Sequence, residues 1–319
     1  MKWKKLGKIF DPTHHKLANN CVEFAQSPQT LVFDDFVRIY FSTRETDPKN
    51  GKFLSHISFV DMDKKFEKVL NISTEQVIPL GKLGTFDEHG IFPINVVRDK
   101  DKILAYTCGW NRRVSVSVET SIGLAISNDN GLTFQKVGNG PVLTASPKEP
   151  FLVGDGFVCI YENSYHMWYI FGTKWVDNTE EESARVYKIG YAKSTDGIHW
   201  IKDEGKQIIT DKLNENECQA LPTVIFANNK YYMFFCYREA IGFRKDKNKG
   251  YKIGYAHSID RINWIRADEH VGIQFSEEGW DSDMQCYPHI FSCDDKIYLL
   301  YNGNQFGKYG FGLAVLEDF

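Results

Sequence analysis

The sequence lacks the features of an exported or membrane protein. No run of about 18 apolar residues occurs in its 319 residues, and the N-terminal stretch MKWKKLGKIFDP has no apolar stretch of the kind found in secretory signals. CxxC spacing is also missing. The seven cysteines are odd in number and lie mostly inside apolar runs, which favours buried thiols in a reducing compartment over disulfides or a zinc site. We therefore expect a cytoplasmic protein.

A strong excess of one charge is absent as well. Lys and Arg number 38 against 42 for Asp and Glu, so the net charge of −4 offers no electrostatic reason for a nucleic-acid or membrane partner. The apolar fraction of 42% is that of a globular protein, which excludes disorder, collagen and coiled coil. What the chain does have is 14% aromatic residues, a class favoured in β-strands.

A repeat of about 64 residues organises the whole chain. Five hairpin patterns begin 63 to 66 residues apart, and each is followed by a third strand pattern, best seen in YKIGYAKSTDGIHWIK at 187–202 and YKIGYAHSIDRINWIR at 251–266. Four strands per unit at this period indicate an all-β, five-bladed β-propeller with four antiparallel strands per blade. The last repeat lacks its own outer strand, so we expect residues 3–10 to pair beside residues 309–319 and to close a single domain, 1–319.

The turn between the third and fourth strands has its own motif. SNDNGLTF, STDGIHW and SIDRINW each place an aspartate where its carboxylate can accept backbone N–H groups of the turn. We therefore expect Asp129, Asp196 and Asp260 to stabilise turns and to take no part in catalysis.

Propeller geometry predicts where a site lies. First strands line the central channel and second strands return, so the starts of the former and the ends of the latter share one face. Acidic residues stand at four of the five inner starts, with arginines and aromatic residues at the second-strand ends, a mixture that suits a hydroxyl-rich ligand. The alternative is a structural ion network between blades. The arginines indicate an anionic ligand group, such as phosphate or a sugar acid, or they offset the acidic cluster. The candidate carboxylates of the site are Glu217, Asp155, Asp87 and Glu88, and we expect the substrate-binding residues Arg44, His89, Trp110, Arg112, Trp175, Gln219, Arg238, Asp281, Asp283 and Gln285.

These inner strand starts resemble those of the five-bladed propeller glycoside hydrolases of families 43, 32, 62, 68 and 130. Asp155, in VGDGF, and Glu217, in ECQA, match two of the three carboxylates of those families, whereas QSP at residues 26–28 stands where they have an aspartate. The resemblance implies that Glu217 is a general acid with a raised pKa and that Asp155 stays ionised to hold the sugar. Asp87 or Glu88 then supplies the missing base.

Three functions follow from this interpretation. The first is a glycosidase acting on a small or intracellular glycan or an activated sugar. The alternatives are a non-catalytic glycan-binding propeller and a phosphate-dependent glycoside phosphorylase or glycosyl-transferring enzyme. We expect a carbohydrate ligand and no cofactor, although a structural calcium ion near His289 in the channel is a further alternative.

Overall fold

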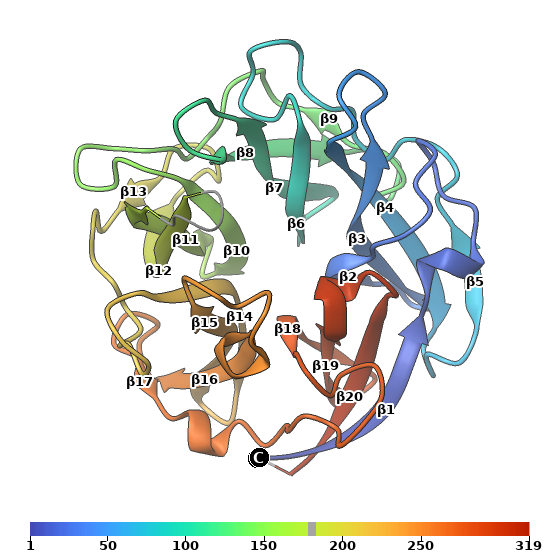
Figure 1. Ribbon diagram of the computed structural model, residues 1–319. Coiled ribbons are helices and arrows are strands. Elements are labelled where there is room, and N and C mark those ends of the chain that lie inside the picture. Colours follow the sequence, from blue (N-terminus) through green and yellow to red (C-terminus); the bar gives the residue numbers. More distant parts are fainter. Residues whose placement is uncertain (178–182, 319) are drawn as a thin grey trace.

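The strands of the protein radiate from a central axis (Figure 1). The computed structural model describes residues 1–177 and 183–318, and the regular elements in these ranges are strands and four short 3-10 helices. The protein is therefore all-β, as predicted. The 3-10 helices are η1 (Pro12–His14), η2 (Lys247–Lys249), η3 (Asp268–His270) and η4 (Asn304–Gly307).

Within the described residues the strands fall into five units of four antiparallel strands. Unit 1 holds β2 (Gln26–Val32), β3 (Phe36–Thr46), β4 (Phe53–Asp63) and β5 (Val69–Ile72), and unit 2 holds β6 (Gly90–Asp99), β7 (Lys102–Arg112), β8 (Val118–Ser127) and β9 (Gln135–Lys136). Unit 3 holds β10 (Val153–Tyr161), β11 (Ser164–Val176), β12 (Ala184–Ser194) and β13 (Ile201–Lys202), and unit 4 holds β14 (Glu217–Ala227), β15 (Lys230–Glu239), β16 (Lys252–Ser258) and β17 (Ile265–Arg266). Unit 5 holds β18 (Cys286–Cys293), β19 (Lys296–Asn302), β20 (Phe311–Asp318) and β1 (Lys2–Phe10). One parallel pair, Ser55 with Gly90, joins units 1 and 2.

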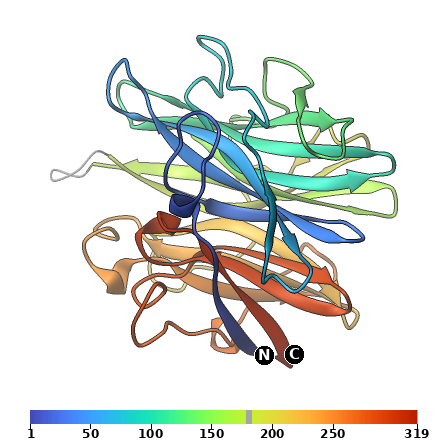
Figure 2. The same cartoon turned by 90° about the vertical axis from the view of Figure 1, so that its right-hand side faces the viewer.

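Unit 5 takes its outer strand from the other end of the chain. β1 pairs antiparallel with β20, and the two ends of the chain lie side by side (Figure 2). The predicted pairing of the N-terminal strand is therefore present. The side chain of Lys5 strengthens it through an ion pair of 2.7 Å with Asp281, which is 1% exposed.

Apolar side chains fill the spaces between neighbouring units. One cluster joins Tyr40 of β3 to Ala105 of β7, and another joins Phe41 of β3 to Phe311 of β20, with ring centroids 6.1 Å apart. Similar clusters join units 2 and 3, units 3 and 4, and units 4 and 5. Because each sheet is covered on both faces, its strands contain many consecutive buried residues.

The aspartate turns form as the sequence predicts. Asp196 Oδ1 accepts the backbone N–H groups of Ile198 and His199 at 2.9 and 2.8 Å, and Asp260 makes the equivalent bonds. Asp129 accepts the N–H of Thr133 in the same manner. These carboxylates are used in local turns.

Each inner strand is interrupted near its start. The pairing register shifts between Gln26 and Gln29 in β2, and at the corresponding place in β6, β10, β14 and β18. In four of these bulges one residue has a positive φ: Ser27, Asp155, Leu221 and Tyr287. A bulge adds a residue and changes the face to which the preceding side chains point. The simple alternation assumed from the sequence therefore fails at the very positions that were expected to face the channel.

Candidate functional site

A cavity of about 570 Å³ opens at the end of the channel where the inner strands start. Aromatic side chains form much of its wall, among them Phe24, Phe53, Trp110, Phe243, Tyr251 and Tyr287. Such rings offer flat apolar faces with hydroxyl groups at the tyrosine edges, a surface on which sugar rings stack. A shallower groove adjoins this cavity and shares Phe53, Trp110 and Ser117 with it. We call the two spaces the inner cavity and the outer groove.

Positive charge is concentrated in the inner cavity. Arg44, Arg185, Arg238 and Arg244 line it, and no aspartate or glutamate is among the described residues that do. Lys308 also lines it but is paired with Glu23 at 3.3 Å. The expectation of a ring of carboxylates around the arginines is therefore wrong. Among the described residues that line the cavity, no carboxylate cluster offsets the charge of these arginines.

Arg238 is the most deeply held of these cations. It is 3% exposed, its Nη1 donates to the carbonyl of Glu239 at 2.7 Å, and its Nη2 donates to the hydroxyl of Tyr187 at 2.8 Å. Its guanidinium lies 3.6 Å from the ring centroid of Phe243. These contacts hold the group rigidly in the cavity wall, while its Nε has no hydrogen-bond partner.

Asp155 is not among the described residues that line the inner cavity, but its carboxyl group interacts electrostatically with Arg185, which does line it. Asp155 is the residue with a positive φ in the bulge of β10, and the corresponding residue in the bulge of β18 is Tyr287, which lines the cavity. The Oδ2 atom of Asp155 accepts the backbone N–H of Leu221 at 3.3 Å. Burial raises the pKa of Asp155 to about 7, although this hydrogen bond and the charge of Arg185 oppose the rise. The raised pKa runs against the expectation that Asp155 stays ionised, because burial favours the neutral form of its carboxyl group.

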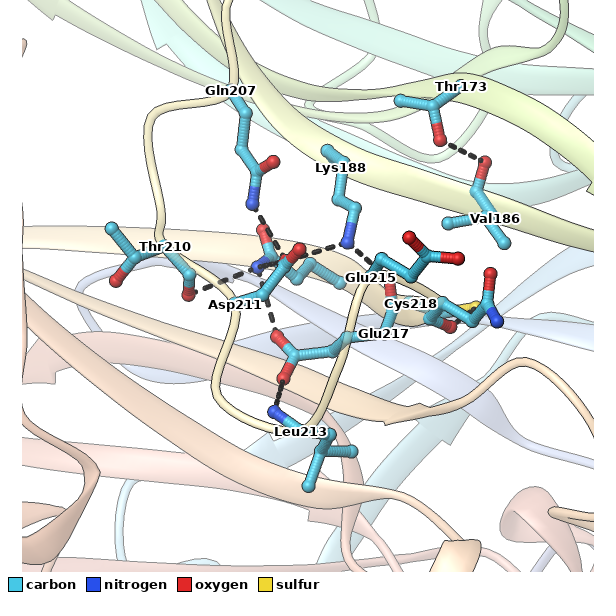
Figure 3. A network of polar contacts seen from close by, with 12 residues as sticks. Thr173, Val186, Lys188, Gln207, Thr210, Asp211, Leu213, Glu215, Glu217 and Cys218 are labelled. Atoms are coloured by element: carbon cyan, nitrogen blue, oxygen red, sulfur yellow. Dashed lines mark hydrogen bonds and ion pairs between the residues drawn. The ribbon is translucent and has the colours of Figure 1, made fainter.

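Glu217 is enclosed in a network of its own (Figure 3). Its Oε2 accepts the backbone N–H groups of Lys212 and Leu213, each at 2.9 Å, and its Oε1 lies 2.5 Å from Nη1 of Arg266. The side chain is fully buried and does not line the cavity. Burial by itself raises the pKa of Glu217, but Arg266 and the hydrogen bonds hold it below its usual value. The predicted raised pKa of a general acid is therefore wrong.

The Asp-Glu-His segment of unit 2 does not reach the inner cavity either. Asp87 is buried in an ion pair with Lys136, and Glu88 accepts the backbone N–H of Gly84 at 2.8 Å. Neither carboxylate is placed to supply the missing base. The ring of His89 stacks on Trp110 with centroids 5.9 Å apart, so this histidine supports an aromatic wall.

Three predicted residues, Asp281, Asp283 and Gln285, lie in the connection before β18. Asp281 binds Lys5 and accepts the hydroxyl of Tyr301 at 3.0 Å and the amide of Gln285 at 3.0 Å. Asp283 is exposed, with Lys247 at 3.7 Å. None of the three lines the inner cavity.

The remaining predicted binding residues divide between the two spaces and the core. Trp110 lines both spaces, and Arg112 lines the outer groove, where its Nη2 donates to the carbonyl of Phe53 at 2.8 Å. Trp175 packs against the hydrophobic cluster between units 3 and 4. Gln219 is fully buried and donates to Glu217 at 3.0 Å.

The surroundings of His289 do not fit a calcium ion. Its Nε2 accepts the N–H of Thr30 at 3.1 Å, and the rings of Phe157 and Phe291 flank it. Burial lowers the pKa of His289 to about 3, so the ring is neutral. Calcium prefers several oxygen ligands, and within residues 1–177 and 183–318 no group of three or more His, Cys, Asp or Glu is arranged to hold a metal.

Sequence reasoning missed Arg185 and Arg244. Arg185 lies near the start of β12, and Arg244 lies in the long connection after β15. The charged composition of the chain around both residues was the available signal. The contribution of Arg244 to the cavity depends on how its connection folds over it.

No helix in the described part of the chain is both long and apolar enough to cross a membrane.

Comparison of the whole sequence with curated proteins gives full-length matches. The chain is 34% identical over 319 residues to the Mycobacterium tuberculosis proteins named Uncharacterized protein Rv1502 and Uncharacterized protein MT1551, and the match covers 100% of each chain. The chain belongs to the Rv1502 family. No protein-family model matches it.

Several solved structures have the same fold as this chain. A glycoside hydrolase superposes with a TM-score of 0.72 at 15% identity, covering 99% of this chain and 93% of its own. The β-1,2-mannobiose phosphorylase from Listeria innocua superposes with a TM-score of 0.68 at 12% identity, covering 99% and 96%. A thermostable family-43 glycoside hydrolase gives 0.64 at 13% identity, covering 94% and 92%. The chain therefore has the fold of the propeller glycoside hydrolase superfamily.

Proposed function

We propose that the protein is a carbohydrate-active enzyme built as one five-bladed β-propeller domain, residues 1–319, with the five units as blades and the β1–β20 pair closing the ring. The observation that carries the proposal is the inner cavity, where aromatic walls and four arginines meet beside a carboxyl group with a raised pKa. A carbohydrate ligand stacks on the aromatic rings, and the guanidinium groups bind its oxygens.

Asp155 is the proposed general acid. A carboxyl group with a pKa of about 7 is partly protonated at neutral pH, so it can donate a proton to the glycosidic oxygen as the bond to the anomeric carbon breaks. This assigns to Asp155 the role that the resemblance implied for Glu217, whose carboxylate is held ionised by Arg266.

Hydrolysis by two flanking carboxylates is the less favoured chemistry. Both the inverting and the retaining mechanisms need a second carboxyl group near the bond. No described residue that lines the inner cavity supplies one. We therefore favour transfer of the glycosyl group to a nucleophile held by the arginines, which is the phosphorylase or glycosyl-transferring alternative.

A non-catalytic glycan-binding propeller is the second candidate. It is favoured by the same lack of a second described carboxylate at the cavity. The test is a screen of aryl glycosides, oligosaccharides and nucleotide sugars with wild type and Asp155→Asn, with Asp99→Asn as the matched control outside the cavity. We expect product from wild type and the control, and binding without turnover from Asp155→Asn. Equal binding by all three proteins with no product from any of them would favour the binding module.

A further inference from the structure

The connection between β19 and β20 contains a left-handed turn at the inner cavity. Gln305 has φ and ψ of 57° and 33°, Phe306 has 58° and 34°, and Gly307 follows with a φ of 75°. Left-handed backbone costs conformational free energy at residues other than glycine, and bulky side chains rarely adopt it. Gln305 and Phe306 are therefore two strained residues in succession.

The residue types at this turn are unusual for the conformation. Four other pairs of consecutive non-glycine residues have a positive φ in the described part of the chain, and each contains Asn or Asp: Asn19–Asn20, Glu162–Asn163, Asn228–Asn229 and Asp294–Asp295. Asn and Asp tolerate left-handed backbone because their short polar side chains bond to the local backbone. Gln and Phe have no such advantage, so the turn itself does not explain their presence.

Hydrogen bonds from the start of unit 1 hold the turn in place. The carbonyl of Phe306 accepts Nε2 of Gln26 at 2.6 Å, and the carbonyl of Gly307 accepts the backbone N–H of Ala25 at 3.0 Å. These bonds join unit 5 to the chain that enters unit 1. Glycine at positions 305 and 306 would keep both bonds without the strain. The two side chains therefore need an explanation of their own.

Packing explains only one of the two side chains, although both line the inner cavity. The ring of Phe306 is half-buried and lies edge-on to the rings of Phe243 and Tyr251, with centroids 6.1 and 6.2 Å apart. These contacts pack the turn of unit 5 against the connection of unit 4. Gln305 is exposed, and its side-chain amide makes no hydrogen bond within the described part of the chain.

Gln305 gives the inner cavity a free side-chain amide. Among the described residues that line the cavity, Gln26 also carries an amide, but Oε1 of Gln26 accepts Nε of Arg44 at 3.0 Å and its Nε2 donates to Phe306. The cavity arginines only donate hydrogen bonds, and no described lining residue is an aspartate or glutamate. A sugar hydroxyl both donates and accepts. The Oε1 atom of Gln305 is thus a free acceptor in a cavity rich in donors.

We propose that Gln305 is a specificity-determining residue, whose amide hydrogen-bonds one hydroxyl group of a sugar in the inner cavity. The turn holds this amide at one place, so a sugar with that hydroxyl inverted loses the bond and leaves a polar group unpaired. The site therefore distinguishes between epimers. The inference rests on the proposed function for the identity of the ligand as a carbohydrate.

The test first measures sugar preference. The methyl glycosides of glucose, mannose, galactose and arabinose are titrated by calorimetry into wild type, Gln305→Ala, Gln305→Gly and Glu162→Gly. We expect wild type to bind one glycoside about tenfold more tightly than its epimer, and both Gln305 variants to lose this preference. Glu162 is exposed, has a φ of 49° and does not line the cavity, so Glu162→Gly is the matched control and should keep the preference.

Urea unfolding of the same proteins separates binding from folding. Gln305→Gly and Glu162→Gly should unfold at a higher urea concentration than wild type, because glycine relieves the strain of left-handed backbone. Gln305→Ala keeps the strain and should not gain stability. A Gln305→Gly variant that is more stable and yet has lost its sugar preference shows that the side chain serves the ligand, whereas a purely structural role predicts a loss of stability.

Four outcomes would overturn the inference: wild type binds none of the four glycosides, wild type binds them equally, both Gln305 variants keep the preference, or Gln305→Gly is less stable than wild type. The proposed function fails separately. A preference that depends on Gln305, with no product in the glycoside screen, refutes the enzyme and keeps the specificity residue. Turnover in which Gln305→Ala leaves the ratio of kcat/KM for two epimeric substrates unchanged refutes the residue and keeps the enzyme.

Discussion

Glu217 and Arg266 form a buried ion pair in which Oε1 and Nη1 are 2.5 Å apart. Arg266 Nη1 also donates to the carbonyl of Thr210 at 2.6 Å, so the pair ties the start of β14 to β17 and to the preceding connection. Glu217, the residue that most resembles a catalytic glutamate, thus holds one unit together. A substitution of Glu217 can distinguish this structural role from a catalytic role.

Glu217→Gln is expected to destabilise the protein by about 3 kcal/mol, because removing one partner leaves Arg266 buried without its counter-charge. Urea unfolding followed by fluorescence measures this, with Glu215→Gln, at an exposed glutamate nearby, as the control. A variant that is as stable as wild type and yet inactive would restore Glu217 as the catalytic acid.

Asp155 should make stability fall as pH rises. Its carboxyl has a pKa of about 7 in the folded state and near 3.8 in the unfolded state, so the folded state holds this proton more tightly. The resulting contribution to the free energy of unfolding is lost as the pH rises from about 4 to about 7. Asp155→Asn should remove this part of the pH dependence and be more stable than wild type at pH 8. Parallel pH profiles of the free energy of unfolding for the two proteins would contradict the assignment.

The rate of turnover should depend on the protonation of Asp155. If protonated Asp155 is the acid, activity of wild type on a substrate found in the glycan screen declines as pH rises through about 7. The pH dependence of kcat/KM measures this decline. A rate that increases steadily from pH 6 to pH 8.5 would exclude Asp155 as the acid.

Lys5 should matter for the attachment of β1. Lys5→Ala leaves the buried Asp281 without its cation, and we expect a loss of about 2 kcal/mol in the free energy of unfolding. Lys4→Ala, at an exposed position of the same strand, is the matched control and should change little. Equal urea midpoints for the two variants would show that the ion pair contributes nothing to this pairing.

Two tryptophans from the sequence prediction can be compared in one binding assay. Trp110 lines both spaces of the site, whereas Trp175 packs against the core. Trp110→Ala should weaken binding of a glycan from the screen about tenfold through lost stacking, with Trp175→Ala near wild type. If only Trp175→Ala weakened binding, the cavity would be the wrong site.

The sequence by itself determined the repeated sheet, because strand periodicity, turn motifs and the 64-residue spacing are local features that recur in each unit. It also determined the pairing of β1 with β20, since the last repeat lacks an outer strand. The aspartate turns followed from contacts within a few residues. The cytoplasmic location stays a prediction.

Only the tertiary structure decided which polar residues face the cavity. Bulges near the starts of the inner strands break the alternation on which the sequence argument relied. Glu217, at the start of β14, and Asp281, in the connection before β18, are both held in buried ion pairs. Arg244 reaches the site through the folding of a long connection. A bulge or a loop path depends on contacts between distant units, and those contacts exist only once the sheets have packed against one another.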